Sequence, residues 1–172
     1  SRGLGDVYKR QMATGGSDAN KQNVKIGFMS SENLTTGYYN VIIGRRAGEN
    51  INTATELVVV GANAGIALTS QNSSVVVGAS AGNASTGDGN VYIGKSAAQE
   101  STSAEQNVII GTYAGIDNQG SQNTLIGYYS GRGSSGNTNG SRNTFIGSQS
   151  GFKIQGGTDN TSLGRNSLLE LL

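Results

Sequence analysis

The 172-residue chain has no Cys, His, Trp or Pro, and these absences exclude several functional classes. Without Cys there is no disulfide framework, and without Cys and His there is no thiolate or imidazole zinc site and no Ser-His-Asp triad. Long apolar runs are missing too. The richest stretch, Leu57 to Leu68, is broken by Asn63 and two glycines and is shorter than the ~18–20 residues that span a bilayer. We therefore expect no catalytic residues, no metal or cofactor site and no membrane insertion.

Charge is also sparse. Lys and Arg number 12 and Asp and Glu number 11, so the net charge is +1, and both signs are scattered along the chain. This pattern lacks the basic patch that marks a nucleic-acid partner. What the chain does contain is small polar residues, because Gly, Ser, Asn and Thr make up 81 of its 172 positions. Such a composition is typical of disorder, but here these residues recur in a fixed order.

Nine glycines recur at spacings of 17, 17, 17, 16, 17, 16, 20 and 17 residues. They are Gly27, Gly44, Gly61, Gly78, Gly94, Gly111, Gly127, Gly147 and Gly164. The residue before each is a branched aliphatic, and the residue three before it is always β-branched, an alternation typical of a strand. Asn stands four before the glycine in seven units, and Ala or Ser followed by Gly comes after it in most of them. The unit is therefore N-[VT]-x-[IVL]-G-x-x-[AS]-G plus a polar loop.

This repeat predicts an all-β fold, a parallel β-solenoid (β-roll or β-helix) of about nine coils of 16–20 residues. A helix is excluded because interior glycines cost ~1 kcal/mol each relative to Ala. The nine recurring glycines are expected to be structural turns, since Gly accepts positive φ without strain. Strands of successive coils would pair in parallel at ~4.7–4.9 Å per coil, which gives a rod roughly 43 Å long.

The middle residue of each predicted strand is mostly apolar as well. The apolar stripe comprises Ile42, Val59, Val76, Tyr92, Ile109, Leu125 and Phe145. A strand that is apolar on both faces is buried on both faces. We therefore expect this stripe to face outward and to pack between identical chains, and burial of the stripe by its own chain would remove that argument.

Units such as Asn107-Val-Ile-Ile-Gly111 and Asn143-Thr-Phe-Ile-Gly147 resemble the repeats of phage tail-fibre shafts, of the kind that precede endosialidase-type chaperone domains. They are also similar to the head repeats of trimeric autotransporter adhesins. The resemblance covers Asn23 to Leu169, and Leu57 and Ser74 depart from it because they replace the Asn. It implies a homotrimer, located in a virion tail fibre or on an extracellular or bacterial surface, that attaches to a cell-surface glycan or protein receptor.

We therefore expect a non-catalytic structural and adhesive segment that acts as a stiff shaft and displays its loops to a receptor. Two alternatives stay open. One is a single-chain solenoid of the ice-binding type, for which Thr124, Thr144 and Thr161 would form part of a row although Val fills the matching place in six units. The other is the non-catalytic part of a tail-spike glycosidase, since no paired carboxylates occur in the repeat.

Candidate receptor-binding residues lie just after the turn glycines. They are Arg45, Arg46, Tyr113, Tyr128 and Tyr129, of residue types that are enriched where binding energy concentrates. The loop at 132–142 is longer than its counterparts and could also bind. A P-loop pattern ending at Lys95 and Ser96 is not interpreted as a phosphate site, because its intervening residues form a predicted strand.

The two ends of the chain differ from the repeats. Residues 1–11 resemble a translated adapter or vector scar and are left out of the fold prediction. Residues 12–22 are expected to be a flexible lead-in, and residues 23–172 the solenoid, which we expect to be truncated within a repeat at its C-terminal end.

Overall fold

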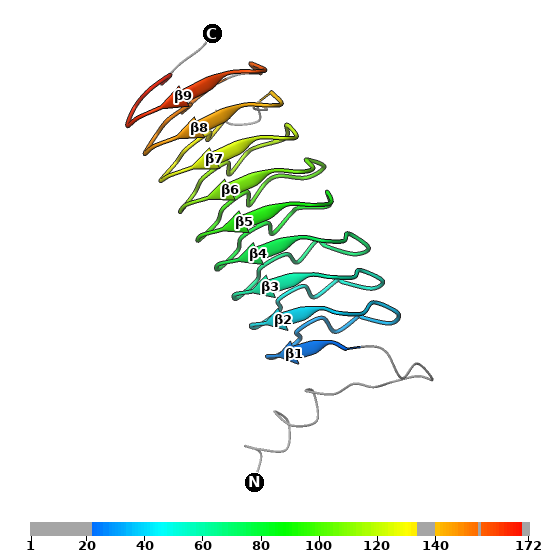
Figure 1. Cartoon of the computed structure of the whole chain (residues 1–172). Coiled ribbons are helices and arrows are strands. Elements are labelled where there is room, and N and C mark those ends of the chain that lie inside the picture. Colours follow the sequence, from blue (N-terminus) through cyan, green and yellow to red (C-terminus); the bar gives the residue numbers. More distant parts are fainter. Residues whose placement is uncertain (1–21, 134–139, 155, 170–172) are drawn as a thin grey trace.

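The computed structural model describes residues 22–133, 140–154 and 156–169, which coil into a parallel β-solenoid (Figure 1). Nine three-residue strands form a single sheet in the order of the sequence. They are β1 (Val24–Ile26), β2 (Val41–Ile43), β3 (Val58–Val60), β4 (Val75–Val77), β5 (Val91–Ile93), β6 (Val108–Ile110), β7 (Thr124–Ile126), β8 (Thr144–Ile146) and β9 (Thr161–Leu163). The described residues include no helix. The predicted fold class is confirmed.

Each coil repeats the path of the one before it. After its strand the chain turns at the C-terminal ends of the strands and returns behind the sheet. It then forms a loop at the opposite side, called here the loop edge, before the next strand begins (Figure 1). Equivalent residues stack, so that Val41 pairs with Val58 and Ile43 with Val60. The return segments are hydrogen-bonded to one another as well, for example from Gly48 N to Ala64 O at 2.9 Å. The predicted scar at 1–11 and nearly all of the lead-in at 12–22 lie outside the described residues.

The recurring glycines occupy the turn that directly follows each strand, and all nine have φ between +126° and +138°. The turns stack closely along the rod. A Cβ on Gly61 would lie 2.5 Å from the carbonyl oxygen of Gly78 in the next coil. Only Gly fits here, because the turn requires positive φ and the neighbouring backbone leaves no room for a side chain.

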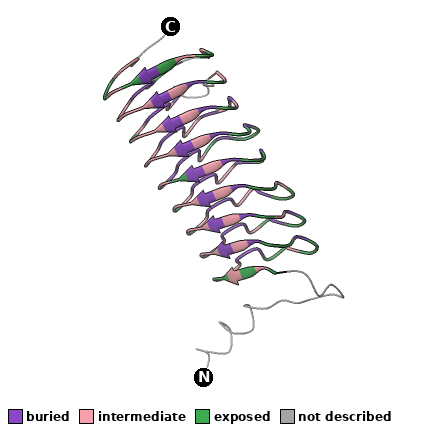
Figure 2. Ribbon diagram, in the orientation of Figure 1, coloured by how far each residue is buried: buried purple, intermediate pink, exposed green. Residues whose placement is uncertain are grey.

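The core lies inside a single chain, between the sheet and the return segments (Figure 2). On the sheet side it is formed by the middle residue of each strand, such as Ile42 and Val59, which have no exposed surface. On the return side, the third residue after each of the first eight turn glycines is a buried Ala or Ser. The seventh residue varies in size, being Ile51 opposite Ile42 but Ser101 in the coil that holds the larger Tyr92. The small Ser101 thus leaves room for the Tyr92 ring in this coil.

The predicted role of the apolar stripe is wrong. All seven residues are at most 1% exposed and face the interior of their own chain: Ile42, Val59, Val76, Tyr92, Ile109, Leu125 and Phe145. They are not available to another chain, and the argument for a partner that rested on them falls. The physical reason is that the return segments of the same chain pack on the face to which the middle residues point, while alternation along the strand places the first and third residues on the other face. The outward residues are therefore the first and the third.

Candidate functional site

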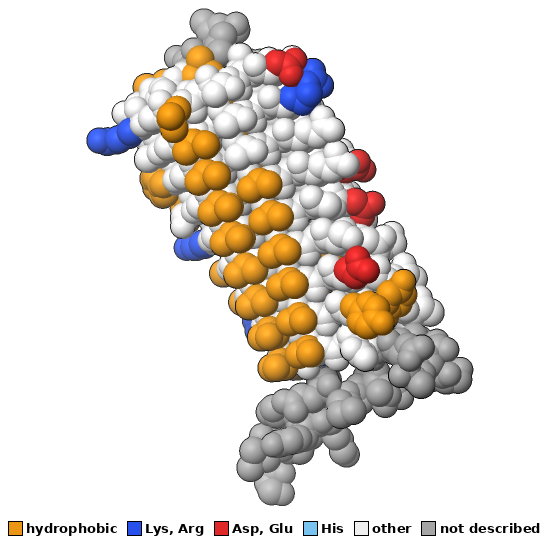
Figure 3. Space-filling model, viewed as in Figure 1, with side chains coloured by type: hydrophobic (Ala, Val, Ile, Leu, Met, Phe, Trp, Pro, Cys, Tyr) orange, Lys and Arg blue, Asp and Glu red, His pale blue; other side chains and the backbone are white. Residues whose placement is uncertain are grey.

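The outer face of the sheet carries two uncharged columns of side chains (Figure 3). One column is apolar over the whole length of the rod, and the other is apolar from β1 to β6 and holds Thr from β7 to β9. The first column contains the first residue of each strand: Val24, Val41, Val58, Val75, Val91, Val108, Thr124, Thr144 and Thr161. The second contains the third residue: Ile26, Ile43, Val60, Val77, Ile93, Ile110, Ile126, Ile146 and Leu163. Neither column holds a charged residue. We call this surface the outer sheet face.

Most side chains of the outer sheet face are half-buried by their neighbours in adjacent coils, and those at the ends are the most exposed. Val24 is 45% exposed and Leu163 is 76% exposed. A flat surface of this length without charge is unusual on a soluble monomer, where large contiguous apolar patches generally mark an interaction site. The chain is thus apolar on both faces of its sheet, as the sequence predicts, but its own residues cover only the inner one.

A second surface lies at the turns that follow β5, β6, β7 and β8. It combines aromatic rings with cations and is named here the aromatic–cation patch. Its members are Tyr113, Tyr128, Tyr129, Phe152, Lys95, Arg132 and Lys153. Three of the five predicted receptor-binding residues are brought together in it. The patch spans four successive coils, or ~14 Å of the rod at ~4.7–4.9 Å per coil.

Ring contacts hold the patch together. Tyr113 and Tyr129 occupy the same position in adjacent coils, and their rings stack with centroids 5.1 Å apart and planes 16° from parallel. The rings of Tyr128 and Tyr129 pack edge to face, with their centroids 4.3 Å apart. Phe152, in the following coil, packs edge to face against Tyr129 with the ring centroids 6.1 Å apart. Tyr129 is therefore enclosed on several sides, whereas Tyr128 keeps 49% of its surface exposed.

The cations of the patch lie over these rings. The guanidinium carbon of Arg132 lies 4.8 Å from the Tyr129 ring centroid, and the Nζ atoms of Lys95 and Lys153 lie 5.8 Å from the Tyr113 and Phe152 rings. These distances are typical of cation–π interactions, which hold each charged group close to a ring. Among the described residues, ion pairs join Arg46 to Glu49 and Arg142 to Asp159, and none involves a cation of the patch.

The Tyr128 phenol stays neutral at ordinary pH. Its pKa is raised above 10.0 mainly by partial desolvation, with further increases from the hydrogen bond and charge of Tyr129, and with a smaller opposing effect of Arg132. A neutral phenol can both donate and accept a hydrogen bond. The patch thus presents neutral aromatic rings next to positive charge.

Arg45 and Arg46, the other two predicted receptor-binding residues, lie apart from the patch. They follow β2, four coils before Tyr113, which is roughly 19 Å along the rod. Both are already engaged: the Nε of Arg46 contacts a carboxylate oxygen of Glu49 at 2.5 Å, and Arg45 donates to Asn63 Oδ1 at 3.4 Å. They form no common site with the tyrosines.

Sequence reasoning missed three members of the patch, Lys95, Phe152 and Lys153, and included Arg132 only as the first residue of the candidate loop at 132–142. A signal for Arg132 and Phe152 was present. Arg132 and Phe152 both stand five residues after a turn glycine, so they occupy equivalent places in adjacent coils. Their approach to Tyr129 depends on the backbone of the turn, where Tyr113 and Tyr129 take φ of 58° and 54°. The repeat pattern alone does not predict that conformation for a Tyr.

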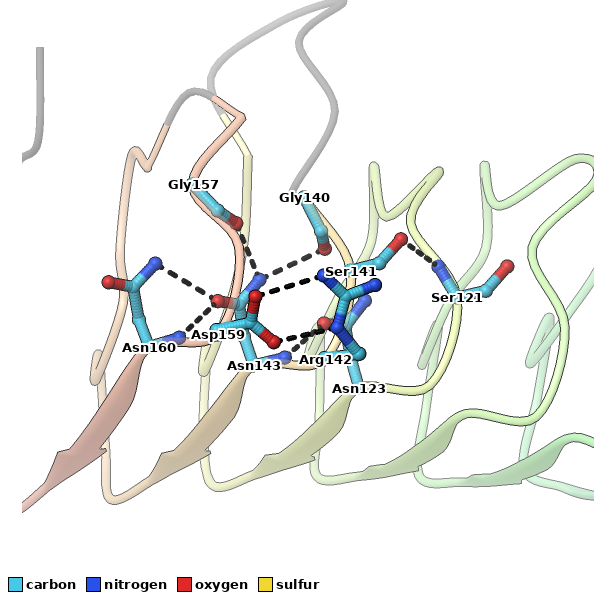
Figure 4. A network of polar contacts seen from close by, with 9 residues as sticks. All are labelled: Ser121, Asn123, Gly140, Ser141, Arg142, Asn143, Gly157, Asp159 and Asn160. Atoms are coloured by element: carbon cyan, nitrogen blue, oxygen red, sulfur yellow. Dashed lines mark hydrogen bonds and ion pairs between the residues drawn. The ribbon is translucent and has the colours of Figure 1, made fainter.

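The loop edge of the solenoid is held by a polar network around Asn143 (Figure 4). Its side-chain amide donates to Gly140 O at 3.0 Å and to Gly157 O at 2.7 Å, and its Oδ1 accepts from Asn160 N at 3.0 Å. Arg142 forms two hydrogen bonds to Asp159, at 2.6 and 2.9 Å. These contacts fix the C-terminal base of the long loop at 132–142. Residues 134–139 lie outside the described residues, so receptor binding by this loop stays a prediction.

The Arg142–Asp159 pair also shifts the ionisation of both groups. The pKa of Asp159 lies below its usual value, chiefly because its carboxylate accepts hydrogen bonds from Arg142, and the pKa of Arg142 is raised for the same reason. Both side chains are exposed, at 62% and 55%, so water screens the attraction. The pair aligns two adjacent loops and adds little to global stability.

No cluster of three or more potential metal ligands occurs among the described residues. Within the same residues there is no helix with the length and apolar character to cross a bilayer. Comparison of the chain with family models, curated proteins and solved structures gives no match.

Proposed function

We propose that this chain is a non-catalytic, structural and adhesive segment of a trimeric fibre, in which three solenoids pack together through their outer sheet faces. The observation that carries the proposal is the pair of uncharged columns on that face, continuous from β1 to β9. A second copy of the chain is the natural occupant, because its columns have the same spacing and the same lack of charge. The count of three comes from the resemblance to tail-fibre and adhesin repeats.

Closed rotational symmetry explains how such a surface remains soluble. Each chain would turn the same face toward a common axis, which covers every copy and leaves no apolar column for further growth. Burial of apolar area stabilises the assembly by about 25 cal/mol per Å². The turns and loops, including the aromatic–cation patch, would stay on the outside.

The proposed mechanism is mechanical. Backbone hydrogen bonds run from coil to coil along the rod, and Val and Ile are stiff side chains that pack well on a pleated surface. The result is a rigid spacer that displays loops and turns to a receptor on a cell surface. A virion tail fibre or an extracellular surface of a bacterium is the setting that the resemblance supports.

Size-exclusion chromatography with light scattering on the full chain tests the proposal. We expect three times the chain mass of 17.6 kDa. The double variant Val60→Lys and Ile110→Lys adds two charges to the outer sheet face and should give a folded monomer. Ser103→Lys, in an exposed loop, serves as the control and should leave the assembly intact. A well-folded monomer of the unaltered chain contradicts the trimer.

Ice binding remains a second candidate for the same face. Thr124, Thr144 and Thr161 do lie in one outward column, as an ice-binding surface requires. Val fills the other six places in that column, and for this reason a partner chain is the preferred occupant. Thermal hysteresis of a monomeric sample would favour the ice-binding function.

A further inference from the structure

We propose that the aromatic–cation patch binds an acidic sugar, that is, a carbohydrate unit bearing a carboxylate. The inference deepens the proposed adhesive role and rests on it, since it names the class of receptor. The outer sheet face plays no part, because the patch lies on the turns rather than on the strands.

The first argument comes from the exposed ring of Tyr128. Its neighbour Tyr129 is fixed by stacking on Tyr113 and by the edge contact with Phe152, so Tyr128 rests on a rigid support. Half of Tyr128 remains open to solvent. An aromatic face is negatively polarised and attracts the positively polarised C–H groups of a flat apolar surface such as one side of a sugar ring. The neutral phenol can hydrogen-bond to hydroxyl groups of the same sugar.

The second argument comes from charge. Arg132 is held over the Tyr129 ring at 4.8 Å, and no described carboxylate forms an ion pair with it. Its guanidinium therefore keeps its fork of donors for a ligand, and that fork matches a carboxylate in a two-pronged hydrogen bond. Lys95 and Lys153 lie at the two ends of the patch and can attract further acidic groups. Tyr128 thus offers an apolar contact, and Arg132 offers a cationic contact for a carboxylate.

A polyanion such as a nucleic acid fits less well. Binding of a phosphate backbone needs Lys and Arg over a long track, because each phosphate along the strand carries a charge. Here the cations are confined to ~14 Å of the rod. Glu100 and Asp117 follow the turns of β5 and β6, beside this stretch, and would repel a continuous row of phosphates. Isolated carboxylates on a short oligosaccharide avoid that repulsion.

The test is calorimetric titration of the full chain with matched pairs of sugars. Trigalacturonate is compared with its methyl ester, and 3′-sialyllactose with lactose, so that each pair differs in its acidic group. We expect at least one acidic sugar to bind, and to bind at least tenfold more tightly than its neutral partner. Failure of both acidic sugars, or equal binding within each pair, overturns the proposal. Tighter binding of a short oligothymidylate overturns it in favour of nucleic acid.

Variants then locate the site. Tyr128→Ala and Arg132→Gln should each weaken binding at least tenfold, as is usual for a central Tyr or Arg anchor. Arg132→Lys, which keeps the charge but loses the fork, should fall between them and the unaltered chain. Tyr38→Ala removes an exposed Tyr from a distant coil and should change nothing. Unchanged affinity in both patch variants overturns the assignment.

Light scattering of the same samples separates this inference from the proposed assembly. A trimer that binds none of the acidic sugars retains the shaft and loses the inferred site. A folded monomer that binds an acidic sugar through Tyr128 and Arg132 retains the site and loses the trimer.

Discussion

The side-chain oxygen of Asn107 accepts a hydrogen bond from the backbone N–H of Asn123, one coil further along, at 2.8 Å. In the same way, the side-chain oxygen of Asn123 accepts from Asn143 N, and that of Asn143 accepts from Asn160 N. The ladder is not continuous. Leu57 has no side-chain acceptor to offer the next coil, whereas the hydroxyl of Ser74 replaces the missing amide and accepts from Asn90 N at 3.1 Å. Of the two departures from the Asn pattern, only the one at Leu57 breaks the ladder.

Replacement of Asn107 by Ala should lower the free energy of unfolding by ~1–3 kcal/mol, because the buried N–H of Asn123 loses its acceptor. Chemical denaturation followed by circular dichroism measures the change. Asn33→Ala is the control, since its hydrogen bond to Glu49 O is exposed and its loss should cost under ~0.5 kcal/mol. Equal effects of the two substitutions would show that the ladder does not stabilise the coil.

Adjacent residues of β6 distinguish the inner from the outer face of the sheet. Ile109→Ala opens a cavity in the core and should cost ~2–5 kcal/mol. Ile110→Ala removes the same atoms from the outer sheet face and should cost less in the folded chain, but it should weaken association. Its effect should therefore depend on protein concentration, whereas that of Ile109→Ala should persist in a monomer. Melting temperatures at several concentrations provide the comparison, and a larger loss for Ile110→Ala in a monomer would contradict the assignment of faces.

Two glycines with positive φ test the stacking of the turns. Gly61→Ala forces a Cβ to within 2.5 Å of the Gly78 carbonyl oxygen and should cost at least ~3 kcal/mol or prevent folding. Gly89 also has positive φ, at 67°, but the nearest atom to an added Cβ is Gln106 Cγ at 3.7 Å. Gly89→Ala should therefore cost only the ~1–2 kcal/mol of backbone strain. Thermal unfolding of both variants measures the difference, and similar losses would mean that close approach of the turns is not what requires Gly61.

Tyr92 makes stability sensitive to alkaline pH. Burial raises its pKa above 10.0, and hydrogen bonds from Ser101 and its other neighbours lower it by less. The folded state thus holds the phenolic proton more tightly than the unfolded state does. Its stabilising contribution is complete below pH 10 and is lost as the pH rises through the raised pKa of the folded state. Urea midpoints measured from pH 8 to 11 should fall less steeply for Tyr92→Phe than for the unaltered chain, and identical slopes would contradict this linkage.

Much of the fold was predictable from the sequence because the repeat fixes local structure directly. The β-branched residue at the position of Val58 and the Gly at the position of Gly61 suffice for a strand followed by a turn. Which side of the strand faces inward was not predictable in the same way. Val58, Val59 and Val60 are identical, so alternation gives two sets of residues without saying which is inside.

A clue to the inner face was nevertheless present in residue size. Middle residues vary widely in size, as Val76 and Tyr92 show, and Tyr92 is accommodated by the small Ser101 on the other wall of the core. The outer columns hold branched side chains of nearly constant size and admit Thr124 and Thr144, which water tolerates. The aromatic–cation patch was predictable in part, because Tyr113 and Tyr129 share a place in the repeat, whereas the cations reach the rings only through the folded turn.

The spacing between turn glycines is 16, 17 or 20 residues, yet every strand pairs with the next without slipping, including Thr124 with Thr144 across the longest interval. Length differences are therefore absorbed entirely at the loop edge, coil by coil. Loops of differing length and composition can therefore be exchanged one at a time while the pairing of the strands stays the same. A scaffold of this kind lets recognition diversify without any redesign of its support.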